Sequence, residues 1–121
     1  MKVNALRRDA ELAWAMFRDP VRSGVVVVTL PEEMPTTETL ELIEILRGEL
    51  SLPVLKVVIN GVLSPLFHPE ERAHLLSDPA LLDVAPATLG AIAGQNAVVA
   101  GARRAAREQV QAESLERLRR S

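Results

Sequence analysis

The sequence has no cysteine and no tyrosine, and aromatic residues make up only 2% of its 121 positions. Without cysteine it has no disulfide, thiolate metal site or cysteine nucleophile, which fits a reducing compartment such as the cytosol. Its aromatic side chains, Trp14, Phe17 and Phe67, are too few for a nucleic-acid surface built on stacked bases. A net charge of −2 also argues against a general polyanion-binding protein.

Long apolar runs are missing too, since no stretch approaches the ~20 residues that a membrane helix needs. The first residues do not have the pattern of a signal peptide. Lysine occurs only at Lys2 and Lys56, and no G-x-x-x-x-G-K-[ST] phosphate loop or G-x-S-x-G elbow is present. We therefore expect a cytoplasmic chain with no transmembrane segment, no nucleic-acid partner and no catalytic residue of its own.

The first half of the sequence has the pattern of a helix followed by a βαβ unit. Asp19-Pro20 ends the first helix, and the run from Val25 has no polar alternation, which is typical of a strand covered on both faces. A strand, helix and strand within about 35 residues predict two parallel strands with a right-handed crossover. The expected elements are a helix over residues 4–18, a strand over 25–30, a helix over 36–49 and a strand over 54–59.

The second half has a helical pattern. We expect a short helix over residues 70–76, a turn over 78–82 and a long helix over 87–119, whose small apolar first half is a packing face. Its charged second half predicts a solvated, ion-paired face that includes Glu108, Glu113 and Glu116. The fold class is therefore α/β, as one partial domain over residues 1–121, with the βαβ part in 1–62 and a helical region in 63–121.

Two parallel strands do not make an independently stable sheet, so we expect either another chain or the rest of a larger chain to complete it. Ligands of open parallel sheets bind beyond the carboxyl ends of the strands. Asn60 follows the second strand, and its amide matches the N6 and N7 edge of adenine, although Asn60-Gly61 is also a common turn dipeptide. Glu32, with Glu33, follows the first strand as a solvated loop residue or as a partner of magnesium-bound water.

Other polar residues favour structural roles. Glu38 lies near the expected start of the second helix, where a carboxylate can cap free backbone N–H groups. His68 and His74 are six positions apart, which is not the spacing of a helical metal pair, so we expect isolated surface histidines and no metal site.

The segment from Val25 to Val62 resembles the anion-transporting ATPase family, which includes arsenical pump-driving ATPases and ATPases that target tail-anchored membrane proteins. The resemblance rests on three motifs: a strand end V-T-x-P-E at Val28–Glu32, an E-T pair at Glu38–Thr39, and a strand end V-I-N at Val58–Asn60. The helix ending in F-R-D-P at Phe17–Pro20 and the Arg-rich last helix also look like bacterial members.

This resemblance implies an incomplete piece of a P-loop NTPase-type sheet, from the C-terminal half of a homodimeric ATPase that binds ATP and magnesium. It implies an adenine contact for Asn60, and a membrane pump or membrane-protein client as a partner of the complete protein. The family's phosphate loop and magnesium-binding segments are not in this sequence, so we expect no cofactor on this chain alone and no ATP hydrolysis by it. The paired cysteines that bind zinc in eukaryotic members are absent, and Gly61 stands where a longer polar residue is common.

Two other functions remain open from the sequence. One is a stand-alone α/β interaction module that pairs with a copy of itself through the incomplete sheet and the small-residue helix. The other is a non-catalytic ATPase relative that regulates a true one.

Overall fold

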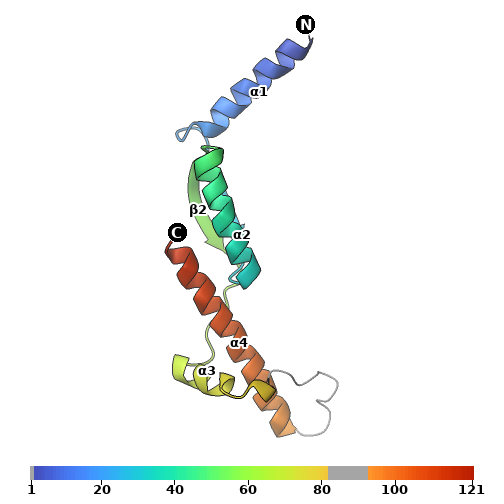
Figure 1. Cartoon of the computed structure of the whole chain (residues 1–121), viewed down its shortest axis with the longest axis vertical. Coiled ribbons are helices and arrows are strands. Elements are labelled where there is room, and N and C mark those ends of the chain that lie inside the picture. Colours follow the sequence, from blue (N-terminus) through green and yellow to red (C-terminus); the bar gives the residue numbers. More distant parts are fainter. Residues whose placement is uncertain (1, 82–92) are drawn as a thin grey trace. The chain divides into compact units, whose positions relative to one another are not determined.

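A computed structural model of the chain describes residues 2–81 and 93–121 (Figure 1). In chain order the elements are α1 (Lys2–Arg18), β1 (Val25–Thr29), α2 (Glu33–Glu44), the π-helical η1 (Ile45–Glu49), β2 (Val54–Ile59), α3 (Pro69–Leu76), the 3-10 turn η2 (Pro79–Leu81) and α4 (Ala93–Arg119). The expected start of the last helix at residue 87, and the end of the expected turn at Leu82, lie outside the described residues. None of the described helices is long and apolar enough to cross a membrane.

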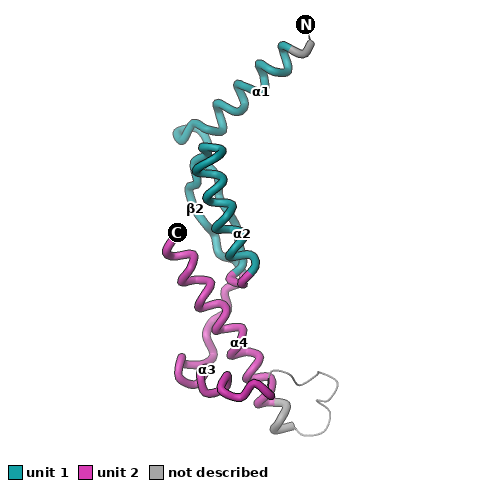
Figure 2. The backbone as a smooth tube through the Cα atoms, viewed as in Figure 1, with its two compact units in different colours: residues 1–30, 34–60, 121 teal, residues 31–33, 61–120 magenta. Residues whose placement is uncertain are grey.

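The chain divides into two compact units (Figure 2). Unit 1 contains α1, the two strands and α2 from its second residue onward, and it includes Met34–Asn60. Unit 2 comprises Pro31–Glu33 and Gly61–Arg120, and so contains α3 and α4. The chain therefore passes from one unit to the other directly after the two strands.

The strands of unit 1 form a two-stranded parallel sheet, as the βαβ pattern predicted. Val25 pairs with Val54, and after an irregularity in register Val26 pairs with Lys56 and Thr29 with Ile59. Because the strands are parallel, their carboxyl ends lie at one edge of the sheet. This confirms the α/β class and the two parallel strands.

One helix covers one face of this sheet. The core consists of Val27 from β1 with Ile43 and Leu46 from the α2–η1 helix, and α2 lies along the strand pair (Figure 1). The other face of β1, which the apolar run predicts to be covered, has no cover within the described residues, and the side chains of β1 alternate between buried and exposed positions. The uncovered face carries apolar residues with large exposed fractions: Val26 at 52%, Val28 at 64% and Val58 at 40%.

The second helix differs at its start from the expected range of 36–49. It begins at Glu33, and Pro35 lies within its first turn, where backbone N–H groups have no acceptor in the helix and a missing N–H costs little. Its last turn is π-helical, with the Leu50 N–H donating to the Ile45 carbonyl five residues back at 3.0 Å. The expected start at Thr36 is wrong because Pro35 fits within the first turn of this helix and does not mark its boundary.

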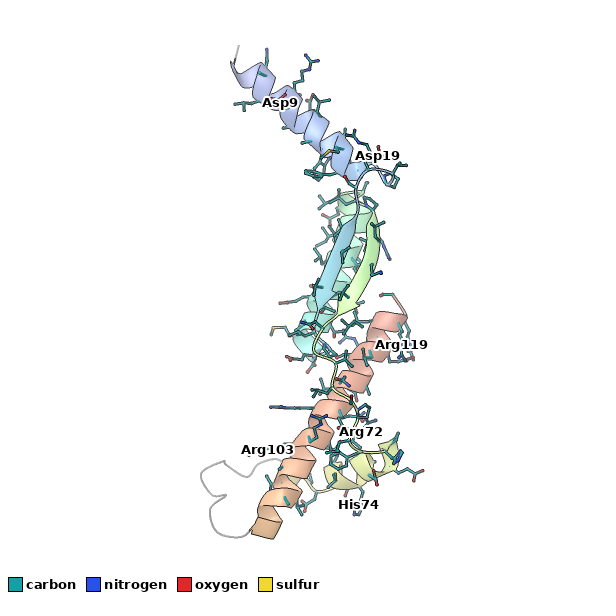
Figure 3. All side chains as sticks on the ribbon, turned by 180° about the vertical axis from the view of Figure 1, so that it is seen from behind. Asp9, Asp19, Arg72, His74, Arg103 and Arg119 are labelled. Carbon is teal, nitrogen blue, oxygen red and sulfur yellow. The ribbon has the colours of Figure 1, made fainter. Side chains whose placement is uncertain are left out.

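Helix α1 of unit 1 exposes most of its surface, and Figure 3 shows Asp9 on it and Asp19 directly after it. The Arg18 guanidinium lies 5.4 Å from the centroid of the Trp14 ring, and its Nε donates to the Leu50 carbonyl at 3.0 Å. Large apolar side chains such as Leu6 remain exposed. Arg18 therefore ties the end of α1 to the end of the η1 segment.

Unit 2 is built on α4, against which α3 packs (Figure 1). The Phe67 ring comes close to α4 at Gly101, where an added Cβ would lie 3.8 Å from the ring. Val99 and Ala102 are buried, in agreement with the expected packing face of this helix. The His68 N–H donates to a Glu71 carboxylate oxygen at 2.8 Å, which satisfies a backbone donor at the start of α3.

Candidate functional site: the pocket at the strand ends

A pocket of about 320 Å³ lies in unit 1 where the parallel strands end. Its walls come from the second half of β1 and the residue after it, from α2 and from the residue that follows β2: Val27, Val28, Thr29, Leu30, Pro35, Glu38, Thr39, Leu42 and Asn60. This volume is at the lower end of the range for small-molecule sites, and the walls are mostly apolar with a few polar groups, as such sites usually are. It lies at the edge where parallel α/β sheets bind ligands.

Two hydrogen bonds fix the polar part of this pocket. The Thr29 hydroxyl donates to the Pro35 carbonyl at 3.2 Å, which holds the end of β1 against the first turn of α2. The Asn60 N–H donates to the Thr29 carbonyl at 2.8 Å, which continues the pairing of the strands by one residue. Thr29 is buried and Asn60 follows it in the pairing, and both residues line the pocket.

Asn60 lines the pocket, and an asparagine carboxamide carries both a donor and an acceptor. The following residue, Gly61, has a φ of 69°, a conformation that glycine adopts without strain. The φ of Gly61 therefore supports the interpretation of Asn60-Gly61 as a turn. Asn60 also lines the pocket, so a turn and a place at the pocket wall occur together. A donor–acceptor pair beside apolar walls is suited to a flat heterocycle with ring nitrogens and an amino group.

The two candidate carboxylates lie in different places. Glu38 was expected to cap the second helix, but α2 begins at Glu33, so Glu38 is in the second turn and too far inside the helix for that role. It lines the pocket instead. Glu32 is exposed in the short segment between β1 and α2, and it is not among the lining residues.

Across residues 2–81 and 93–121, no group of three or more His, Asp or Glu side chains is arranged to hold a metal ion. His68 lies directly before α3, and His74 lies in its last turn, where Figure 3 labels it. Both belong to unit 2, and neither lines the pocket of unit 1.

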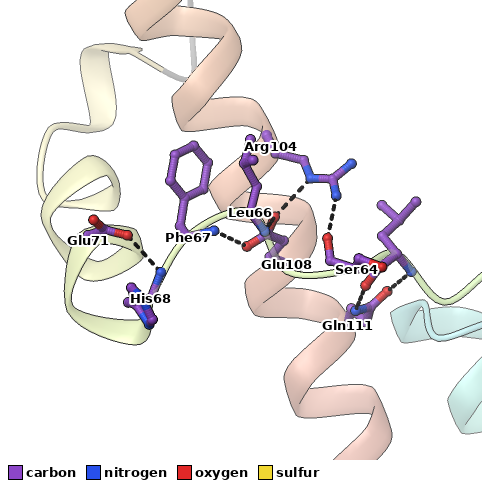
Figure 4. Close-up of polar contacts among 9 residues, drawn as sticks. Ser64, Leu66, Phe67, His68, Glu71, Arg104, Glu108 and Gln111 are labelled. Atoms are coloured by element: carbon purple, nitrogen blue, oxygen red, sulfur yellow. Dashed lines mark hydrogen bonds and ion pairs between the residues drawn. The ribbon is translucent and has the colours of Figure 1, made fainter.

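A second polar cluster, in unit 2, holds the backbone of residues 63–67 (Figure 4). We call Arg104, Glu108 and Gln111 of α4 the α4 clamp. Gln111 accepts from the Leu63 N–H at 2.7 Å and donates to the carbonyl of the same residue at 2.9 Å. Glu108 accepts from the N–H groups of residues 66 and 67 at 2.7 and 3.3 Å, and Arg104 donates to the carbonyl of residue 64 at 2.8 Å.

Glu108 is the most enclosed charged residue of the clamp, with only 1% of its surface exposed. Burial by itself raises the pKa of its carboxyl group, but the hydrogen bond from Arg104, 2.9 Å away, and the two backbone N–H donors lower the pKa by more. The net pKa of Glu108 is therefore below its ordinary value. The carboxylate stays ionised at neutral pH and accepts all of these bonds.

Glu108 forms the expected ion pair with a residue one turn away, Arg104, but it is buried, so the expectation that it is solvated is wrong. Glu116 does form the expected exposed ion pair, 2.8 Å from Arg120, and Glu113 accepts from Gln109 at 2.7 Å. Glu108 differs because residues 63–67 cover it. One signal was available in the sequence: positions 104, 108 and 111 lie on one face of a helix, and the small residue Ala105 lies one turn before Glu108.

Comparison with known proteins adds no relative, since no family model, no curated protein and no solved structure matches this chain.

Proposed function

We propose that this chain is the adenine-binding, C-terminal portion of a larger ATPase of the anion-transporting type, and that Asn60 contacts the base. The observation that carries the proposal is the position of Asn60 in an apolar pocket at the carboxyl edge of a βαβ unit. The motifs Val28–Glu32 and Val58–Asn60, on which the family resemblance rests, are the two strand ends that meet there.

The pocket suits the base better than the phosphates. Its walls are mostly apolar, and Asn60 supplies a donor and an acceptor, whereas the sequence has no phosphate loop. Glu38 is the one acidic side chain at its wall, and a single carboxylate is a poor partner for a triphosphate. The proposal therefore assigns ATP phosphates and magnesium to other parts of the complete protein, and hydrolysis with them.

The uncovered sheet face supports the same proposal. Val26, Val28 and Val58 form an exposed apolar surface, and the sheet has no third strand within the described residues. Further strands and helices of a larger α/β protein would pair the strand edges and bury this surface, and burial of apolar area is the dominant driving force of folding. In this proposal the complete protein is a cytoplasmic homodimer whose partner is a membrane pump or a membrane-protein client.

The test uses the complete protein encoded by the reading frame that contains this sequence. Titration with ATP should show that Asn60→Ala weakens binding about 5- to 150-fold, because a good contact of an amide with a base is worth roughly 1–3 kcal/mol. Asn4→Ala is the matched control, since Asn4 is exposed on α1. Equal ATP affinity of the Asn60 and Asn4 variants would remove Asn60 from the site, and a reading frame without a phosphate loop would remove the ATPase.

The uncovered face also favours a second candidate, a module that pairs with its own copy. Light scattering on the 121-residue chain separates the two functions. Self-pairing predicts a dimer that Val28→Lys converts to a monomer, because Val28 is 64% exposed on that face. A wild-type chain that is monomeric at all concentrations contradicts the self-pairing module.

A further inference from the structure

Helix α1 of unit 1 carries an apolar face that is largely exposed. Five residues are spaced at i, i+4, i+7, i+8 and i+11, which places them on one side of the helix. We call them the α1 face: Leu6, Ala10, Ala13, Trp14 and Phe17. No residue between positions 4 and 18 is buried, and Leu6 and Phe17 are 71% and 48% exposed. The apolar surface of this helix is therefore open to a partner.

Cationic side chains border the α1 face. Arg7, Trp14 and Arg18 are spaced at i, i+7 and i+11, so they share the side of the helix where the apolar face ends. The Arg18 guanidinium lies 5.4 Å from the centroid of the Trp14 ring, and Arg7 pairs with Glu11 at 3.0 Å. Four cationic and two acidic side chains give α1 a charge of +2, whereas the whole chain has −2, so the other residues together carry −4. Helix α1 is thus a positive element of a negatively charged chain.

We infer that the α1 face binds the surface of an anionic lipid bilayer, with the helix lying in the interface and not crossing it. Arginines on the polar side and Leu, Phe and Trp on the apolar side are the pattern of interfacial helices. The apolar side chains enter the boundary of the acyl chains, while the Trp14 ring and the arginine head groups stay among the lipid phosphates. The inference uses neither the pocket nor Asn60, so it is independent of the proposed function.

The pattern suits a lipid surface better than a second copy of this chain. A coiled coil needs apolar heptads over about three to four repeats, whereas α1 has 17 residues, little more than two repeats. Two of the five face residues are alanines, which bury little apolar area against a partner helix. Anionic lipids, in contrast, attract each cationic side chain that lies near the bilayer surface. The charge of α1 therefore decides in favour of the bilayer.

The experiment uses the 121-residue chain and follows the fluorescence of Trp14, its only tryptophan. Vesicles of phosphatidylcholine and phosphatidylglycerol in equal parts should shift the Trp14 emission to shorter wavelength, and vesicles of phosphatidylcholine alone should bind the chain about tenfold more weakly. Leu6→Gln should weaken binding to the mixed vesicles about 10- to 100-fold, since a leucine side chain no longer enters apolar surroundings. Leu12→Gln is the matched control and should bind like the unmutated chain, because Leu12 is 62% exposed but lies outside the α1 face.

Four results would overturn the inference. One is a Trp14 emission that the mixed vesicles leave unchanged, and another is equal binding by Leu6→Gln and Leu12→Gln. A dimer in lipid-free solution that Leu6→Gln converts to a monomer would assign the α1 face to a second copy. In vesicle flotation, a complete protein that stays unbound while the 121-residue chain binds would show that the rest of that protein covers the face. None of these results changes the expected effect of Asn60→Ala on ATP binding, so the two proposals fail separately.

Discussion

Gln111 offers the sharpest stability test of unit 2, because it has a matched neighbour on the same helix. The Gln111→Ala change removes two hydrogen bonds to the Leu63 backbone, of 2.7 and 2.9 Å, from a side chain that is only 7% exposed. Gln109→Ala makes the same chemical change two positions earlier, and there it removes one bond to Glu113 on the helix surface. The difference between the two variants isolates the contact with Leu63 from the change in helix propensity.

The expected magnitude follows from the bonds that are lost. A typical intramolecular hydrogen bond contributes about 0.5–1.5 kcal/mol net, so two of them set an upper range of about 1–3 kcal/mol. Leu63 is 36% exposed, so water can replace part of what Gln111 gave, and we expect about 1–2 kcal/mol. The control should lose only about 0.2–0.5 kcal/mol, the size of a surface pair at i and i+4.

The assay is urea unfolding of the 121-residue chain followed by circular dichroism at the helix band, to which the 27-residue α4 contributes strongly. With an m-value of about 2 kcal/mol/M, the midpoint of Gln111→Ala should fall about 0.5–1 M below that of the unmutated chain. Gln109→Ala should stay within about 0.25 M of it. Equal midpoints for the two variants would refute the claim that α4 holds residues 63–67.

Three further perturbations have defined outcomes. Gly101→Ala should stabilise unit 2 by roughly 0.5–1 kcal/mol in the same urea assay, because alanine favours the helix more than glycine does. The added Cβ would lie 3.8 Å from the Phe67 ring, which is an ordinary contact distance. A lower urea midpoint would contradict this packing. Because its pKa is lowered on folding, Glu108 stabilises the folded chain above its unfolded pKa of about 4.3, and this stability is lost as the pH falls through the folded pKa. Urea midpoints measured from about pH 6 to about pH 2 should therefore fall less steeply in Glu108→Gln than in the unmutated chain. Identical pH profiles would contradict the pKa assignment. Thr29→Val should cost about 0.5–1.5 kcal/mol by removing the bond to the Pro35 carbonyl, and unchanged thermal unfolding would show that this bond does not hold β1 to α2.

The strands were predictable because their signal is local. A run of β-branched residues bounded by proline or glycine predicts a strand without reference to the rest of the chain, and the structure has strands at Val25–Thr29 and Val54–Ile59, within one residue of the expected ranges. Parallel pairing followed from the intervening helix. The pocket position of Asn60 also followed from topology, since both strand ends must lie at the same edge.

The errors concern mainly features that depend on distant parts of the chain. Whether Glu108 is solvated depends on where residues 63–67 run, about 40 positions earlier, and helix periodicity does not contain that information. The cover on the second face of β1 is likewise a tertiary property, and the apolar run at Val25 could not decide it. The start of α2 was missed for a local reason, because Pro35 is compatible with a first helical turn as well as with a break.

The contact of the Asn60 carboxamide with a nucleotide base is tested most directly by NMR. The side-chain amide resonance of Asn60 is followed in the nitrogen-labelled complete protein during titration with ATP. If the carboxamide contacts the base, the Asn60 resonance shifts saturably with ATP and does not shift with inorganic triphosphate, while the Asn4 side-chain resonance stays in place. An Asn60 resonance that does not move at saturating ATP would contradict the claim.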